Sequence, residues 1–124
     1  MGPSLSRHDL AVAAERSVGE YLVARGYEIV ASNLRVGHLE LDLVARKGQV
    51  VAVVEVRTRG PRAWTTGLGS MGALKRQRIR RAGERLWQRR YRNDESVERM
   101  RFDAASVRFD ARGVPTVEYV IAAF

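Results

Sequence analysis

The sequence predicts a single α/β domain in which a mixed central sheet is flanked by two helices. Apolar residues recur at helical spacing in two segments and at strand spacing in five others, in the order α-β-β-β-α-β-β. The chain has 124 residues, of which 45% are hydrophobic, and a chain of this length has room for one core. We therefore expect residues 1–124 to form one domain.

The first half of the chain is predicted to begin with a helix and to continue with three strands. Residues 7–25 carry apolar side chains at helical spacing, and Gly26 follows as a signal for the helix C-terminus. Residues 27–32 are expected to form a short strand. Residues 39–59 contain two apolar runs separated by a Lys-Gly pair, a pattern that is typical of a β-hairpin.

The second half is predicted to contain a loop, a helix and two strands. Residues 60–72 include four Gly and one Pro, which is typical of a flexible loop. Residues 73–91 carry an apolar stripe at helical spacing despite Gly83. Residues 100–109 alternate as a strand does, and residues 114–121 can pair with them across a turn.

Several classes of protein are excluded by the composition. No segment approaches the roughly 20 apolar residues that a bilayer helix needs, and the amino terminus lacks the profile of a secretory signal. We expect a cytoplasmic protein without a membrane partner. The absence of cysteine excludes disulfides and thiolate metal sites, so a metal ion would have to be bound by oxygen atoms or by the two histidines.

The charge of the chain suggests a partner. A net charge of +8, from 22 basic and 14 acidic residues, favours a polyanion such as nucleic acid or an anionic membrane surface. Codon usage in a genome rich in G and C would also enrich arginine, without any ligand. Both explanations are open on composition alone.

The predicted second helix concentrates the positive charge. Between Lys75 and Arg92, nine basic residues stand against one acid, Glu84. Contacts with DNA phosphates would explain this pattern, although a solvated amphipathic helix would show it as well. In the loop, Trp64 could stack on bases, whereas Trp87 has the position of a core residue. The candidate nucleic-acid contacts are Lys75, Arg76, Arg78, Arg80, Arg81 and Trp64.

Three carboxylates, Glu40, Asp42 and Glu55, interrupt the otherwise apolar hairpin. If residues 47–48 form a two-residue turn, Asp42 pairs with Val53 and Glu40 with Glu55. Side chains alternate along a strand, so the three acids then lie on one face of the hairpin. A turn of three residues would instead move Glu55 to the other face.

Carboxylates gathered on one face repel one another, so we expect a positive charge beside them. Asp42 and Glu55 would be diagonal neighbours about 7 Å apart, so both could bind one cation, with Glu40 and Arg57 on the same face. A hard divalent ion, Mg²⁺ or Mn²⁺, suits such oxygen ligands. Acids on a half-exposed hairpin can also be simply solvated, and the geometry alone leaves both interpretations open.

Several blocks of the sequence resemble one family. The blocks are "ELDLVA" (40–45), "VVEVRTR" (53–59), "AERSVGEYLVARGYEIVASNLR" (14–35), "LKRQRIRRAG" (74–83) and "RFD" (101–103). In this order they resemble the YraN family of endonuclease-like proteins, which are related to Holliday-junction resolvases. The resemblance extends over nearly the whole chain.

The resemblance implies a restriction-endonuclease-like fold with a site of the PD-(D/E)xK type. The matching positions are Asp42, Glu55 and, at the third motif position, Arg57, while Glu15 matches an acid directed toward the metal from the first helix. The implied cofactor is Mg²⁺ or Mn²⁺, with Asp42, Glu55, Glu15 and Glu40 as candidate ligands. The implied reaction is hydrolysis of DNA phosphodiester bonds, on branched or single-stranded DNA.

Arg57 departs from the family pattern, which usually has lysine at this position. Arginine can orient water and offset charge, but it does not release its proton and so cannot act as a base. Whether the protein is an enzyme therefore stays open. The alternatives are a metal-dependent endonuclease, a nucleic-acid-binding module of the same fold with weak or lost catalysis, and a protein-interaction adaptor. A homodimer is compatible with the sequence, but no exposed apolar seam indicates one.

Overall fold

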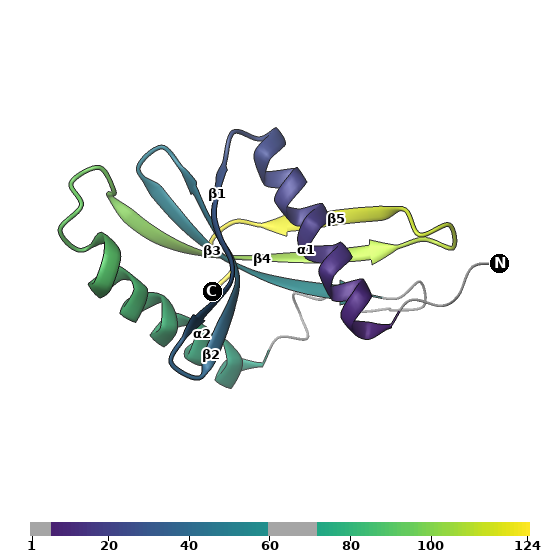
Figure 1. The fold of residues 1–124 in the computed structure, drawn as a ribbon, viewed down its shortest axis with the longest axis horizontal. Coiled ribbons are helices and arrows are strands. Elements are labelled where there is room, and N and C mark those ends of the chain that lie inside the picture. Colours follow the sequence, from purple (N-terminus) through teal and green to yellow (C-terminus); the bar gives the residue numbers. More distant parts are fainter. Residues whose placement is uncertain (1–5, 60–71) are drawn as a thin grey trace.

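The structure, a computed structural model, describes residues 6–59 and 72–124 and contains one sheet with two helices. In chain order the elements are α1 (Arg7–Ala24), β1 (Glu28–Val36), β2 (Leu39–Lys47), β3 (Val50–Arg59), α2 (Ala73–Leu86), the π-helical turn η1 (Trp87–Tyr91), β4 (Arg99–Phe109) and β5 (Pro115–Val120) (Figure 1). The predicted order of elements is confirmed, and the arrangement is consistent with a restriction-endonuclease-like fold. Of the expected loop of residues 60–72, the stretch 60–71 lies outside the described residues.

The five strands form one sheet in the order β1-β2-β3-β4-β5. Three neighbouring pairs are antiparallel, and β3 and β4 are parallel. A parallel pair requires a long crossover connection, which includes α2 here. The expectation of a mixed sheet is therefore confirmed.

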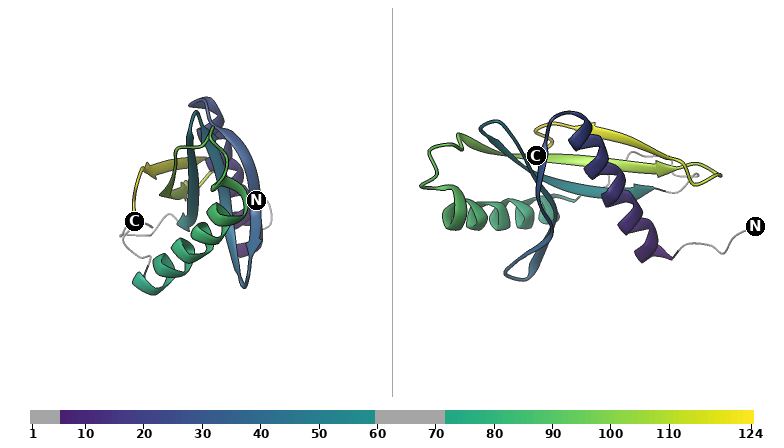
Figure 2. Two further views of the ribbon diagram at one scale, coloured as in Figure 1. Left: turned by 90° about the vertical axis from the view of Figure 1, so that its left-hand side faces the viewer. Right: turned by 45° about the horizontal axis from the view of Figure 1, so that its top comes forward.

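The two helices cover opposite faces of the sheet (Figure 2). On one face, α1 buries Ala14, Val18 and Leu22 against the strands. On the other face, α2 packs through a stripe that includes Ile79. Gly83 continues this stripe because a Cβ atom there would lie 2.6 Å from the ring of Phe102, so the close approach of helix and sheet excludes a larger residue. Within residues 6–59 and 72–124, no helix is long and apolar enough to span a bilayer.

The hairpin of β2 and β3 has a different register from the expected one. Lys47 pairs with Val50, so the turn consists of residues 48–49, and the prediction of a turn at residues 47–48 was wrong. The backbone explains the difference. Gly48 has a φ of +59°, and the first central residue of a two-residue hairpin turn needs a positive φ, which glycine adopts without strain.

The corrected register changes the neighbours of the acids. A shift of two positions preserves the alternation of side chains, and the register of the last pair, Leu43–Val54, brings Asp42 next to Glu55 rather than Val53. Leu41 packs in the cluster under α2 and Leu43 in the cluster under α1, so these two residues of β2 lie on opposite faces of the sheet. Apolar residues cover both faces of this hairpin, so it is not half-exposed.

Asp103 of β4 is the centre of a buried hydrogen-bond network. Its carboxylate is fully buried and accepts two hydrogen bonds of 2.8 Å from the guanidinium of Arg101. It also accepts hydrogen bonds from the Tyr119 hydroxyl at 2.5 Å and from the Ala122 backbone N–H at 2.8 Å. Arg101 donates a further bond to the Tyr27 hydroxyl at 2.6 Å. The network links β4 to Tyr27, just before β1, to β5 and to the segment after β5.

Candidate active site

One surface pocket, with a volume of about 270 Å³, brings together four of the residues expected at the site. Glu15 comes from α1, Asp42 from β2, and Glu55 and Arg57 from β3, two positions apart. A further charged residue, Lys75, enters from α2. The remaining lining residues are Ala11, Val56 and Thr58. We call this the carboxylate pocket.

Asp42 lies where the two strands of the hairpin separate. Backbone pairing between β2 and β3 extends from the turn to the pair Leu43–Val54 and ends there. Beyond that pair, the Val56 backbone N–H donates to Oδ2 of Asp42 at 2.8 Å. The side chain therefore takes the place of the next backbone acceptor, which fixes the carboxylate at the floor of the pocket.

Asp42 and Glu55 are close enough to perturb each other. The pKa of the Asp42 carboxyl is raised to about 7, first by burial and then by the charge of Glu55 and a hydrogen bond with its side chain, against the lowering effect of the Val56 N–H. Glu15 adds a smaller increase to the pKa. The fold thus holds carboxylates at a separation that favours a shared proton, or another positive charge, between them.

Glu15 is positioned by a strained residue of β1. Asn33 has a φ of +52°, a conformation that asparagine tolerates better than most residues, and lies opposite Asp42 between two regular pairs. Its side-chain amide donates to Oε2 of Glu15 at 3.0 Å. No role was predicted for Asn33 from the sequence, although an asparagine in the middle of a strand is a signal for irregular backbone.

Lys75 makes an ion pair with Glu55 inside the pocket. The distance from Nζ of Lys75 to Oε1 of Glu55 is 2.6 Å, and the Glu55 side chain is only 5% exposed. The sequence placed Lys75 among the phosphate contacts, and its position beside a carboxylate was not foreseen. Arg57 lines the same pocket, and its buried Nε has no hydrogen-bond partner among the residues that the structure describes.

Comparison with known proteins assigns the chain to a family. A family model described as "Uncharacterised protein family UPF0102" matches residues 14–107. The chain belongs to this family. The matched segment contains every charged residue of the carboxylate pocket, and the resemblance to the YraN family is confirmed.

Relatives in this family cover most of the chain. A UPF0102 protein of Sorangium cellulosum is 54% identical over 119 residues, which are 96% of this chain and 83% of that protein. A UPF0102 protein of Nocardia farcinica is 40% identical over 111 residues, or 86% of this chain and 85% of the relative. In Gloeobacter violaceus, a UPF0102 protein is 37% identical over 120 residues, or 95% and 94% of the two chains.

The donor set of the pocket suits a hard divalent ion that keeps part of its water shell. Within the described residues, no group of three or more His, Cys, Asp or Glu side chains is arranged to hold a metal ion. Asp42 and Glu55 are adjacent, and Glu15 is engaged by Asn33. Mg²⁺ typically binds through one or two carboxylates, with water and substrate phosphate completing its shell, so the two adjacent acids of this UPF0102 protein fit that ion.

Glu40 does not join the carboxylate pocket. It is exposed on β2, where it pairs with Arg35 of β1. The expected pairing of Glu40 with Glu55 is not formed. The turn lies one position further along the chain, and the residues of β2 that precede Leu43 do not pair with β3. Glu40 therefore lies apart from the other three candidate ligands.

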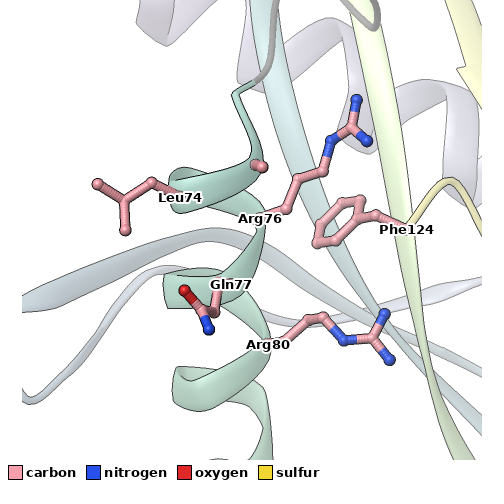
Figure 3. Close-up of a pocket in the computed structure, with 6 residues that line it drawn as sticks. Leu74, Arg76, Gln77, Arg80 and Phe124 are labelled. Carbon is pink, nitrogen blue, oxygen red and sulfur yellow. The ribbon is translucent and has the colours of Figure 1, made fainter.

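The basic residues of α2 line two further hollows. Arg76 and Arg80 reach along either side of the Phe124 ring in a groove of about 590 Å³, whereas Leu74 and Gln77 lie on the other side of the helix (Figure 3). The guanidinium of Arg80 is 5.3 Å from the centre of the Phe102 ring. The Phe102 ring contacts the Phe124 ring in a tilted arrangement. We call this the aromatic groove.

The second hollow lies on another flank of α2, beside the β1–β2 turn. It has a volume of about 430 Å³, and three arginines together with His38 line it. The arginines are Arg78, Arg81 and Arg85. Trp64, the expected stacking residue, lies outside the described residues, and Trp87 packs against the core as expected.

Proposed function

We propose that this UPF0102 protein is a metal-dependent nuclease that hydrolyses phosphodiester bonds in DNA. The observation that carries the proposal is the pairing of Asp42 with Glu55 in an open pocket that also contains Glu15, Arg57 and Lys75. Carboxylates that are held together at the cost of a raised pKa are typical of catalytic and metal-binding sites. Action on DNA agrees with the cytoplasmic location expected from the sequence.

Four of the five charged residues of the pocket have distinct tasks in this proposal. Asp42, fixed by the Val56 N–H, and Glu55 would hold the divalent ion, which would polarise the scissile phosphate and activate water for attack. Glu15, oriented by Asn33, would accept hydrogen bonds from water in the pocket. The guanidinium of Arg57 would pair with a phosphate oxygen, a geometry in which arginine is effective, and would offset the charge that develops during cleavage.

The two basic hollows on α2 support nucleic acid as the substrate. Arginines on both flanks of the helix can contact successive phosphates, and a half-buried aromatic ring between two guanidinium groups, lining an open groove, suits an unpaired base. The carboxylate pocket opens beside the first turn of the same helix, where Lys75 is the immediate neighbour of Arg76. A strand bound in the aromatic groove would therefore pass close to the carboxylates.

A second candidate function is DNA binding without efficient cleavage. The ion pair between Lys75 and Glu55 favours it, because an ammonium already occupies one of the two adjacent carboxylates. Arg57, which cannot serve as a base, points the same way.

A cleavage assay separates the two functions. Purified protein is incubated with branched, duplex and single-stranded DNA in Mn²⁺, in parallel with Asp42→Ala and with Glu84→Gln, an acid on the exposed side of α2 outside the carboxylate pocket. We expect the wild type and Glu84→Gln to cut at least one of these forms, and Asp42→Ala to bind DNA without cutting it. Absence of cutting by the wild type, or equal cutting by Asp42→Ala, would show that the nuclease proposal is wrong.

A further inference from the structure

Lys75 stands out among the basic residues of the chain. Of 22 basic residues only two, Lys47 and Lys75, are lysine, so arginine is the default cation in this sequence. Lys47 covers the ring of Tyr27 next to a hairpin turn. Lys75 instead contacts a nearly buried carboxylate at 2.6 Å.

The Lys75–Glu55 pair differs from an ordinary surface ion pair. Exposed pairs contribute little because water solvates both partners. Here the Glu55 side chain is 5% exposed, whereas the Lys75 side chain, at 43%, retains access to solvent. The carboxylate therefore depends on this ammonium for its charge partner, and the ammonium can leave it by rotating outward into water.

The shape of the cation matters at this position. A lysine ammonium is a compact point charge on a flexible stem, whereas a guanidinium is planar and presents its donors in a rigid fork. Arg57 shares the pocket with Glu55, but the carboxylate takes its ion pair from the lysine of another element. The chain thus carries arginine on β3 and supplies the ammonium from α2.

We propose that Lys75 is the lysine of this active site, acting from α2 in place of a lysine at strand position 57, and that it competes with the divalent ion for Glu55. The inference rests on the proposed nuclease function. Without a divalent ion, Lys75 is the counter-ion of Glu55. With the ion bound, its ammonium is released toward the reacting phosphate, where it lowers the energy of the developing negative charge.

The competition makes opposite predictions for metal affinity and for cleavage. Removing the ammonium leaves Glu55 without its partner, so a divalent ion should bind more tightly. Removing it also deletes a positive charge next to the phosphate, so cleavage should slow. A lysine that only stabilised the fold would weaken metal binding and cleavage together, and one that only bound the DNA backbone would leave metal affinity unchanged.

The experiment compares Lys75→Met with Arg78→Met, which removes one charge from α2 without contact to Glu55. Titration calorimetry with Mn²⁺ measures ion affinity without DNA, and single-turnover cleavage measures chemistry at saturating DNA. We expect Lys75→Met to bind Mn²⁺ about ten times more tightly and to cleave at least ten times more slowly. Arg78→Met should weaken DNA binding but retain wild-type Mn²⁺ affinity. Lys75→Gln, which keeps a hydrogen-bond donor for Glu55, provides the same comparison if Lys75→Met does not fold.

A relocated lysine completes the test. The double variant Arg57→Lys with Lys75→Met should recover part of the lost cleavage, because it returns an ammonium to the pocket from β3. Mn²⁺ affinity of Lys75→Met within twofold of the wild type, or cleavage reduced no more than in Arg78→Met, would overturn the role of Lys75. If the wild type itself neither binds Mn²⁺ nor cleaves, the nuclease proposal fails first and the role of Lys75 fails with it.

Discussion

Replacing Asp42 with asparagine should stabilise the folded protein at pH 8, even though it removes a residue that we place at the centre of the site. Asparagine is neutral at every pH and nearly isosteric with aspartate. Its side-chain oxygen can accept the bond from the Val56 N–H, and its amide can donate to Glu55 in place of the shared proton. The variant therefore retains the contacts of Asp42 and loses its unfavourable charge.

The size and pH dependence of the effect follow from the shifted pKa of Asp42. The pKa of Asp42 rises from 3.8 to about 7 on folding. Below pH 3.8 both folded and unfolded chains carry the proton, whereas between pH 4 and pH 7 only the folded chain retains it, so wild-type stability falls as the pH rises through this window. A shift of about 3 units corresponds to about 4 kcal/mol, at about 1.36 kcal/mol per unit. Because Asp42 is only half-buried, solvent screens part of this effect, and we expect a gain of about 2 kcal/mol for Asp42→Asn at pH 8 and little change at pH 4.

Urea denaturation followed by far-UV circular dichroism at several pH values measures this difference directly. Asp94→Asn is a suitable comparison, because hydrogen bonds from Ser96 lower the pKa of the exposed Asp94 and its removal should not stabilise the protein at pH 8. The reasoning would be refuted if Asp42→Asn were no more stable than the wild type at pH 8, or if its effect were the same at pH 4 and pH 8.

Two further predictions concern the aromatic groove and the buried network. The double variant Arg76→Ala, Arg80→Ala should weaken binding of single-stranded DNA and reduce the slope of log affinity against log salt by about 1.4, since each phosphate contact contributes about 0.7. Fluorescence anisotropy without divalent ions measures the slope, with the exposed Arg112→Ala as control, and an unchanged slope would contradict the contact. Asp103→Ala should reduce the free energy of unfolding by about 3 kcal/mol because it leaves the partly buried Arg101 of the network without its partner. In the same urea titration, a loss below about 1 kcal/mol would show that the network matters little.

The sequence predicted the elements well because their signals are local. Both helices and the order of elements along the chain were predicted from helical spacing, strand alternation and glycine positions. The hairpin shows the limit of such signals, because its turn was predicted at residues 47–48. The first position of the turn requires a positive φ, which Gly48 adopts without strain, and this favours a turn at residues 48–49. Asp42 and Glu55 nevertheless lie in one pocket, because an error of two positions leaves the alternation unchanged, whereas Glu40 lies apart.

The composition of the pocket was only partly predictable. Asp42 and Glu55 stand on adjacent strands, so their proximity follows from the hairpin alone. Glu15 came from the resemblance to a family, since no local pattern brings α1 to the end of β2. Lys75 was assigned to the basic face of α2, because charge counting does not show which side chain of a helix turns toward the sheet. The role of Asn33 could be predicted only with knowledge of the irregular backbone opposite Asp42.

The parallel pairing of β3 with β4 has a consequence for the order in which the molecule assembles. Val50 and Arg99, which pair in this ladder, are 49 positions apart in the chain, whereas β1, β2 and β3 follow one another as local hairpins. Contacts between distant segments form slowly because a long loop must close first. We therefore expect α1 and the first three strands to bring Asp42 and Glu55 together early, and the docking of α2 and β4 to supply Lys75 late. During folding, the two acids are repelling neighbours before their counter-ion arrives, so divalent cations at this stage would act as folding aids as well as cofactors.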